Sequence, residues 1–221
     1  MTKRLWLAAG LALLAGISAS IYFNAEPEKE HRQVKTLDQI QLPDLNGKQQ
    51  SVSQWQGKVL LINFWATWCP PCREEIPVFL SLRNKFSSAG FEVVGVSIDS
   101  QFSHFAWRET PVNKGGIGPV KFPIVADINH SITQDYGIEH PAGVALRASF
   151  LIDKEGVVQH QVVNNLPLGR NIDEMLRLID ALQFTEEHGE VCPAGWQKGD
   201  DGMKPSGDGV ASYLDANADK L

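Results

Sequence analysis

Two cysteines separated by two residues, Cys69 and Cys72, are the side chains in this sequence best suited to chemistry. They stand between an apolar run typical of a buried strand, Val59 to Phe64, and a helical pattern from about Cys72 to Ser88. A thiol near the first turn of a helix is favoured as thiolate by the unpaired N–H groups and the positive end of the helix dipole. Because a thiolate attacks disulfides and peroxides, the pair predicts a thiol-based redox enzyme.

The third cysteine, Cys192, is far away in the sequence, and three cysteines cannot form a disulfide scaffold. One close pair with one distant thiol therefore indicates catalysis. Two thiolates can also hold Cu(I) or zinc. No third and fourth ligands stand near the pair, and the six histidines show no ligand spacing. We expect neither a metal site nor another cofactor.

The elements that must position the pair follow from the hydrophobic pattern. Two more strands are predicted at Phe91 to Asp99 and Ala148 to Asp153, and the second forms a hairpin with Val157 to Val163. Helices are predicted at Phe102 to Glu109 and, with an apolar face, at Asn171 to Phe184. This order predicts an α/β fold, a mixed central sheet with helices on both faces.

The first 23 residues form a predicted targeting segment. Lys3 and Arg4 precede an apolar run from Leu5 to Phe23, which as a helix is long enough to cross a bilayer. Acidic residues follow it, so the positive-inside rule predicts a membrane-anchored protein on the periplasmic or extracytoplasmic face. A cleaved signal peptide at Ser18-Ala19-Ser20, which would give a secreted protein, is the alternative.

The rest of the chain divides by composition. Residues 24–33 read as a polar spacer, 34–184 as the folded domain and 185–221 as a tail rich in Gly, Asp and Lys. A net charge of −6 argues against a nucleic-acid partner.

Residues up to about 95 resemble membrane-anchored thioredoxin-like proteins of the TlpA/ResA type. The resemblance rests on Leu42-Pro43-Asp44-Leu45, on the run from Gly57 through Trp68-Cys69-Pro70-Pro71-Cys72, and on Glu75-Ile76-Pro77. It implies a thioredoxin-like fold and a monomer supplied with electrons by a membrane thiol carrier.

Residues from about 92 to 221 resemble typical two-cysteine peroxiredoxins of the AhpC/Prx type, which share the thioredoxin-like fold. This resemblance rests on motifs spread over that half: Val94 to Phe102, Gly115-Gly116-Ile117-Gly118, Phe122 to Asp127, Asn165 to Arg170 and Gly189 to Trp196. It implies peroxide substrates, a thioredoxin-like reductant and homodimers through the tail. It also implies that Cys192 resolves the oxidised cysteine of the partner subunit. The chain thus reads as a hybrid, natural or engineered, joined inside a strand common to both families.

Each half departs from its family. A thioredoxin-type site carries a cis-proline just before the strand that starts at Ala148, where this chain has Arg147. The peroxiredoxin resemblance implies such an arginine, which would stabilise the thiolate and bind the peroxide. A peroxiredoxin also carries a proline and a threonine seven and three residues before its peroxidatic cysteine. If Cys72 has that role, Trp65 and Cys69 occupy those places.

Three functions follow from these residues. The leading hypothesis is a thiol:disulfide oxidoreductase, in which Cys69 attacks a protein disulfide and Cys72 resolves the mixed disulfide. The alternative is a peroxidase for hydrogen peroxide or organic hydroperoxides. There Cys72, or as the weaker choice Cys69, becomes a sulfenic acid beside Arg147 and is resolved by Cys69 or Cys192. The third is a binding or holdase module, or a hybrid without efficient activity.

Overall fold

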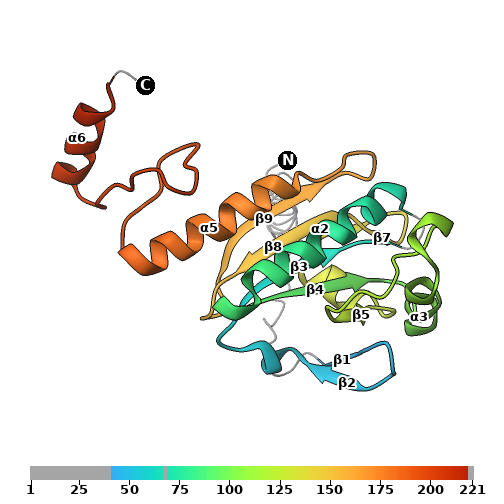
Figure 1. Ribbon diagram of the computed structural model, residues 1–221. Coiled ribbons are helices and arrows are strands. Elements are labelled where there is room, and N and C mark those ends of the chain that lie inside the picture. The colour runs from blue at the N-terminus through green and yellow to red at the C-terminus, as the bar shows by residue number, and fades with distance from the viewer. Residues whose placement is uncertain (1–40, 67–68, 219–221) are drawn as a thin grey trace, which may run out of the picture. The chain divides into compact units, whose positions relative to one another are not determined.

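A five-stranded sheet forms the centre of the computed structural model, which describes residues 41–66 and 69–218 (Figure 1). The strand order is β5-β4-β3-β8-β9. The strands are β3 (Val59–Phe64), β4 (Phe91–Ser97), β5 (Ile124–Ala126), β8 (Arg147–Ile152) and β9 (Val158–Asn164). The β3–β4 and β4–β5 pairs are parallel, and the β3–β8 and β8–β9 pairs are antiparallel. The predicted mixed sheet is confirmed.

Two short hairpins flank this sheet. One pairs β1 (Gln41–Pro43) with β2 (Gln49–Ser51), and its turn includes Gly47 at a positive φ of 76°. The other pairs β6 (Glu139–His140) with β7 (Val144–Ala145) and leads directly into β8. In the described part of the chain, three short 3₁₀ helices lie in the connections: η2 (Val52–Trp55), η3 (Ser87–Ala89) and η4 (Val112–Lys114).

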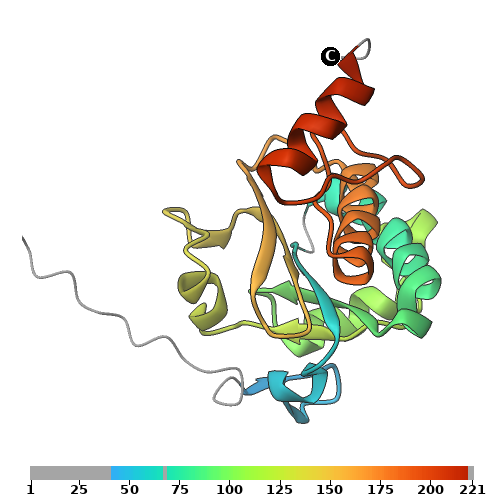
Figure 2. The same ribbon diagram turned by 90° about the vertical axis from the view of Figure 1, so that its left-hand side faces the viewer.

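The central strand β3 is buried on both faces, which explains its unbroken apolar sequence. Val59 and Leu61 join the core cluster beneath the helices α2 (Pro70–Phe86) and α5 (Ile172–His188). The alternate residues, including Ile62, join a second cluster beneath α4 (Ser131–Asp135). Helices therefore cover both faces of the sheet, as Figure 2 shows, and the predicted thioredoxin-like α/β fold is confirmed.

The helix α3 (Gln101–Glu109) follows β4 and packs beside β5. Ser100 caps its first turn by accepting a hydrogen bond from the backbone N–H of Ser103. The predicted boundaries of α3 and of β8 differ from the observed ones by only one residue each. The larger difference is in α5, which continues past the predicted end at Phe184 to His188 and ends at Gly189 with φ of 66°.

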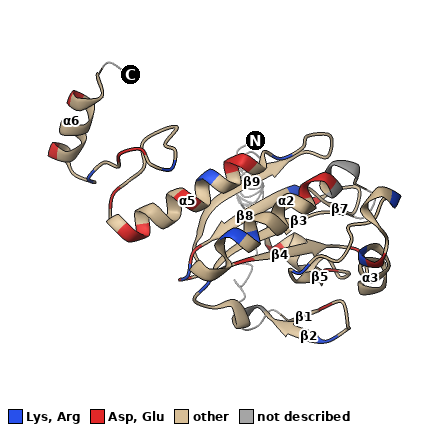
Figure 3. Cartoon of the chain, viewed as in Figure 1, with Lys and Arg blue, Asp and Glu red and all other residues tan. Residues whose placement is uncertain are grey.

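The C-terminal segment after α5 is folded rather than simply polar. Val191 and Met203 form a β-bridge. Trp196 is only 2% exposed, and the centroid of its ring lies 5.0 Å from that of the Phe184 ring. A last helix, α6 (Gly207–Ala216), follows. Acidic positions recur along α5, this segment and α6, in agreement with the negative net charge (Figure 3). The composition alone did not predict α6.

No helix within 41–66 and 69–218 is both long and apolar enough to cross a membrane. The predicted span, Leu5 to Phe23, and the predicted boundary near residue 34 lie outside the described residues.

Candidate active site

The two cysteines stand where β3 gives way to α2, as predicted. Cys69 is the N-cap residue of α2, and Cys72 lies in its first turn. The Cys69 sulfur accepts a hydrogen bond from the backbone N–H of Cys72 at 3.3 Å, so a cysteine sulfur takes the capping position usually held by a Ser or Asp oxygen. Pro70 and Pro71 occupy the first helical positions, where a proline loses no hydrogen bond.

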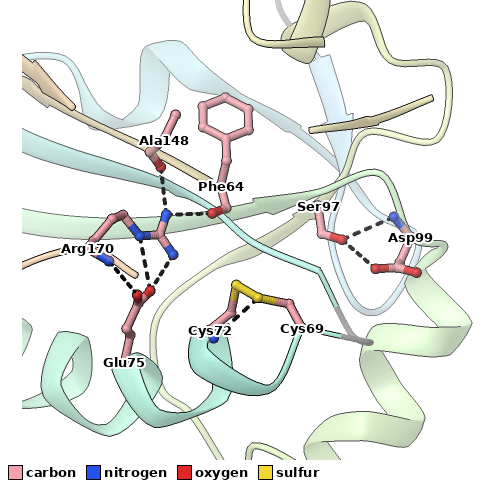
Figure 4. The surroundings of a disulfide bond; sticks show 8 residues. All are labelled: Phe64, Cys69, Cys72, Glu75, Ser97, Asp99, Ala148 and Arg170. Carbon is pink, nitrogen blue, oxygen red and sulfur yellow. Dashed lines mark hydrogen bonds and ion pairs between the residues drawn. A yellow bond between two sulfur atoms is a disulfide. The ribbon is translucent and has the colours of Figure 1, made fainter. Parts of the chain in front are cut away.

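Cys69 and Cys72 form a disulfide whose Cα atoms lie 5.4 Å apart (Figure 4). Helix α2 is continuous from Pro70 through Phe86 while this bond is in place. Both cysteines are buried, with exposed fractions of 3% and 2%. The native fold therefore accommodates the Cys69–Cys72 disulfide and also shields both sulfurs from solvent.

A small cavity of about 20 Å³ lies over the disulfide, room for roughly one water molecule. Apart from the two cysteines and Arg147, its walls are apolar. They are formed by Phe64, Trp65, Ala66, Ala145, Leu146 and Leu166. Such walls exclude bulk solvent and strengthen any electrostatic interaction inside.

Arg147 is the first residue of β8 and pairs in register with Asn164 of β9. It is 8% exposed, and its Nη1 has no hydrogen-bond partner within the part of the chain that the structure describes. A buried N–H donor without a partner is costly, so its presence beside two sulfurs suggests that it meets a bound oxygen or an anion. The peroxiredoxin resemblance implies an arginine beside the cysteines, and Arg147 lines the same cavity as Cys69 and Cys72.

A second arginine lies behind the disulfide and was not singled out from the sequence. Arg170 donates from its backbone N–H and from Nε to the Glu75 carboxylate, at 3.2 and 3.0 Å, and Nη2 also pairs with Glu75. Its Nη1 donates to the carbonyl oxygens of Phe64, at 2.6 Å, and of Ala148, at 2.9 Å (Figure 4). One guanidinium thus ties together β3, β8, α2 and the loop before α5.

The environment of Glu75 is unusual for a helical glutamate, which is ordinarily exposed to solvent. Glu75 is buried and its partner is 95 residues away, so no local pattern could reveal the pair. Burial lowers the pKa of the Arg170 guanidinium, Glu75 opposes this change, and the positive charge of Arg147 adds to it. The only available signal was the spacing of Glu75 three residues after Cys72, one helical turn.

Aromatic rings form the wall of the site toward α3. Trp65 stacks on Trp107 with centroids 4.4 Å apart and planes inclined by 12°. The ring of His104 lies 5.1 Å from that of Trp65 and is completely buried. Burial lowers the pKa of His104 to about 4, so its imidazole is neutral at pH 7. Nearby, the Ser97 hydroxyl donates to the Asp99 carboxylate at 2.6 Å (Figure 4).

Cys192, the third predicted site residue, is not part of this cavity. It is partly buried against α5, where its sulfur lies 3.8 Å from the carbonyl oxygen of Ala181 and 3.9 Å from the hydroxyl of Thr185. Within the described chain the structure brings together Cys69, Cys72 and Arg147, and leaves Cys192 elsewhere.

The sequence of this chain matches known protein families and individual proteins. The sequence pattern described as the AhpC/TSA family matches residues 35–161, and that described as the C-terminal domain of 1-Cys peroxiredoxin matches residues 181–216. Alkyl hydroperoxide reductase C of Helicobacter pylori is 59% identical over 150 residues, 68% of this chain and 76% of that protein. Peroxiredoxin-2 of Rattus norvegicus is 44% identical over 169 residues, 76% of this chain and 85% of the relative.

Solved structures agree with these sequence relationships. The reduced 2-Cys peroxiredoxin of Plasmodium vivax superposes with a TM-score of 0.73 at 42% identity, over 79% of this chain and 93% of the other. AhpC of Enterococcus faecalis gives a TM-score of 0.63 at 30% identity, over 70% and 94%.

These relatives overturn one sequence-based prediction. The localisation as a membrane-anchored protein on the periplasmic or extracytoplasmic face rested on Leu5 to Phe23 and on the TlpA/ResA resemblance. The proteins found are alkyl hydroperoxide reductases and peroxiredoxins, and they contradict that localisation. An apolar run preceded by cations is a signal of composition alone, and in this chain it led to a localisation that the relatives contradict.

Proposed function

Because the chain belongs to the AhpC/TSA family of peroxiredoxins, we propose that it is a thiol peroxidase in which Cys72 reduces hydrogen peroxide or organic hydroperoxides. The observation that carries the proposal concerns Arg147: it lines the same small cavity as Cys72, and its buried Nη1 has no hydrogen-bond partner among the described residues. That donor is suited to an oxygen atom that gains negative charge, which is what peroxide cleavage creates.

In the first step the Cys72 thiolate attacks one peroxide oxygen. The O–O bond breaks, Cys72 becomes a sulfenic acid, and the other oxygen leaves as water or an alcohol after taking up a proton. Cys72 lies in the first turn of α2, where the positive end of the helix dipole favours the thiolate form. Arg147 binds the peroxide and stabilises the charge on the leaving oxygen.

In the second step the Cys69 thiol attacks the sulfenic sulfur of Cys72. The S–O bond breaks, water leaves, and the Cys69–Cys72 disulfide forms. A dithiol protein then reduces this disulfide and becomes oxidised itself, which returns both cysteines to thiols. The proposal assigns resolution to Cys69 because its sulfur already touches the backbone of Cys72. Resolution by Cys192 of a second subunit, and with it a homodimer, is the competing proposal.

The Arg170–Glu75 pair positions the site without touching the peroxide. Because Arg170 holds the backbone carbonyls of Phe64 and Ala148, it fixes the ends of the strands that carry the cavity wall. Glu75 neutralises this second arginine, so that Arg147 is the charged side chain among the described residues that line the cavity.

Thiol–disulfide exchange with protein substrates is the second candidate, and the Cys69–Cys72 disulfide at a helix N-terminus favours it. Burial argues against it. With both cysteines at most 3% exposed, a small peroxide reaches the sulfurs more readily than a protein does, so we expect exchange with protein dithiols and disulfides to be much slower than peroxide reduction.

We retain the hybrid origin of the site as part of the proposal. The sequence match to the AhpC/TSA family runs through residues 35–161 and therefore across the supposed junction near residue 95. The motif around Cys69 and Cys72 nevertheless departs from the peroxiredoxin pattern, with Trp65 and Cys69 in place of the proline and the threonine. In this departure Cys69 supplies a resolving thiol within the peroxidase site itself.

The test compares two initial rates on the reduced full chain: consumption of hydrogen peroxide and reduction of a protein disulfide. We expect fast peroxide consumption that is lost in Cys72→Ser and unchanged in the matched control Cys192→Ser, with slow disulfide reduction in all three. Disulfide reduction faster than peroxide consumption would favour the second candidate. A folded protein with neither activity would support a binding or holdase role.

A further inference from the structure

The cavity over the disulfide is narrow for a peroxide that carries a large substituent. Cys69 and Cys72 are at most 3% exposed, and the cavity of about 20 Å³ has room for roughly one water molecule. A thiolate attacks one oxygen of the peroxide while the second oxygen leaves, so both oxygens must lie close to the buried sulfur. Little space then remains for a group attached to the second oxygen.

The described walls of this cavity come from elements other than α2. Phe64 ends β3, and Trp65 and Ala66 follow it directly. Leu146 lies between β7 and β8, and Leu166 lies in the loop after β9. Since none of these residues belongs to the helix that carries the sulfurs, opening the disulfide does not require the walls to move.

Trp65 is the largest of these wall residues, and its position is fixed on several sides. It is 3% exposed, and its ring stacks on that of Trp107 with centroids 4.4 Å apart. Its backbone N–H donates to the carbonyl oxygen of Val96 at 3.0 Å. A Cβ atom placed on Gly95 would lie only 3.1 Å from Trp65 Nε1, so the indole rests against the backbone of β4. This leaves the ring no room to retreat toward that strand.

The ring on which Trp65 stacks is itself held in place. Trp107 Nε1 donates to the carbonyl oxygen of Gly115 at 2.7 Å, and the Trp107 carbonyl oxygen accepts from the backbone N–H of Ile117 at 3.1 Å. The completely buried ring of His104 lies 5.1 Å from that of Trp65. Because a core packed at native density resists displacement of its side chains, Trp65 forms a rigid wall.

We propose, resting on the peroxidase function above, that Trp65 determines substrate specificity: it admits hydrogen peroxide and disfavours hydroperoxides that carry a large alkyl or aryl group. The second oxygen of hydrogen peroxide bears only a hydrogen atom, which fits beside the stacked rings. A bulky substituent has to displace the Trp65 ring from Trp107 and from β4, and forcing extra atoms into a packed core is costly. Trp65 stands where the peroxiredoxin pattern has a proline, so this limit is a property of a residue particular to this chain.

The experiment measures the second-order rate constant for oxidation of the reduced full chain by hydrogen peroxide, tert-butyl hydroperoxide and cumene hydroperoxide. Rapid quenching, thiol alkylation and mass spectrometry count the thiols that remain at Cys69 and Cys72, so the readout does not depend on tryptophan fluorescence. In the wild type we expect the rate constant to fall in that order, by at least about tenfold from hydrogen peroxide to cumene hydroperoxide. This measurement needs no variant to fold.

Trp65→Phe and Trp65→Ala test the assigned residue, and Trp55→Phe is the matched control. Trp55 is also buried, at 6% exposed, but it belongs to the second core cluster. The readout is the ratio of the rate constants for hydrogen peroxide and cumene hydroperoxide, which a loss of folded protein does not change. We expect this ratio to shrink by at least about tenfold in Trp65→Ala and by less in Trp65→Phe, and to stay unchanged in Trp55→Phe.

Two kinds of failure can be told apart. Equal rate constants for the three peroxides in the wild type would overturn the proposed specificity and leave the peroxidase function standing. A ratio that is unchanged in the Trp65 variants, or that shrinks as much in Trp55→Phe, would do the same. Absence of hydrogen peroxide consumption in the wild type would overturn both the specificity and the peroxidase function.

Discussion

Arg147 carries the charge on which the proposed chemistry depends. It lies at the start of β8, is 8% exposed and lines the cavity with Cys69 and Cys72, and its Nη1 has no hydrogen-bond partner among the described residues. Because that cavity is small and otherwise apolar, a positive charge there acts with little screening by solvent. In the proposed reaction the two cysteines supply the electrons, and Arg147 stabilises the charge that develops on the leaving oxygen.

Replacing Arg147 by Gln tests this assignment. We expect the second-order rate of peroxide reduction to fall by roughly 10²- to 10³-fold, since this is the usual cost of removing a preorganised donor to a developing oxyanion. The rate is measured in stopped flow on reduced protein, with the midpoint of urea unfolding as the check on folding. Arg147→Lys keeps the charge but loses the fork of donors, so its rate should lie between those of the wild type and Arg147→Gln. An unchanged rate in Arg147→Gln would exclude this role.

The residues that could be predicted from the sequence are those whose neighbours are local. Cys69 and Cys72 are three apart on one turn, so their chemistry is readable from spacing. Arg147 was identified only through a family resemblance. Glu75 and Arg170 could not be paired, because the contact joins positions 95 residues apart and depends on how β3, β8 and α2 meet.

At the scale of elements, the Arg170–Glu75 pair holds the site together. Its guanidinium is buried and bonds to two strand carbonyls as well as to the carboxylate on α2. A buried charge without its partner is far more costly than an exposed one. The loop before α5 therefore contributes to the active site although it carries no reacting group.

Replacing Glu75 by Leu leaves the Arg170 charge buried and uncompensated. We expect the free energy of unfolding, measured in urea, to fall by about 3–5 kcal/mol. The matched control is Lys154→Met, which removes the exposed ion pair with Glu186 and should cost at most about 1 kcal/mol. Equal effects of the two substitutions would show that the buried pair is not a structural anchor.

Helix α3 introduces a pH dependence through His104. Burial lowers its pKa from 6.5 to about 4 in the folded chain, so between these values the unfolded chain binds the extra proton. Stability is therefore complete above about pH 6.5 and falls as the pH drops toward 4, by up to about 3 kcal/mol in total.

The corresponding measurement is the free energy of unfolding at pH 7 and pH 4.5 for wild type and His104→Leu. Leucine suits the site because neither ring nitrogen has a partner among the described residues. The variant should lose less stability on acidification than the wild type does. An identical loss in both proteins would mean that other groups cause the acid sensitivity.

Strands and helices were predicted well where one period dominates the sequence. β3 is buried on both faces and reads as an unbroken apolar run, and α5 shows an apolar stripe. The segment after α5 was predicted only as a polar tail. It folds because single residues such as Trp196 pack on α5, and a few contacts of this kind leave no periodic pattern.

At the scale of the whole molecule, the structure separates a closed redox pair from a distant thiol. Cys192 is fixed to α5 through its own segment, whereas Cys69 and Cys72 need nothing beyond their helix turn. The account therefore places a complete catalytic cycle within one chain.

Loosening the C-terminal segment should expose Cys192 without altering catalysis. In Trp196→Ala we expect faster alkylation of Cys192 by iodoacetamide than in the wild type, because a buried ring that fixes the segment is lost. Peroxide consumption should stay unchanged. A drop in that rate would indicate that the segment contributes to the active site.

The most direct test of the central claim is to map the disulfide that forms when the reduced full chain reacts with one equivalent of hydrogen peroxide. The account predicts that the peroxide is consumed, that peptide mass mapping finds Cys69 bonded to Cys72, that Cys192 remains a free thiol, and that the chain migrates as a monomer on a non-reducing gel. A Cys72–Cys192 bond between two chains, or peroxide left unconsumed, would contradict it.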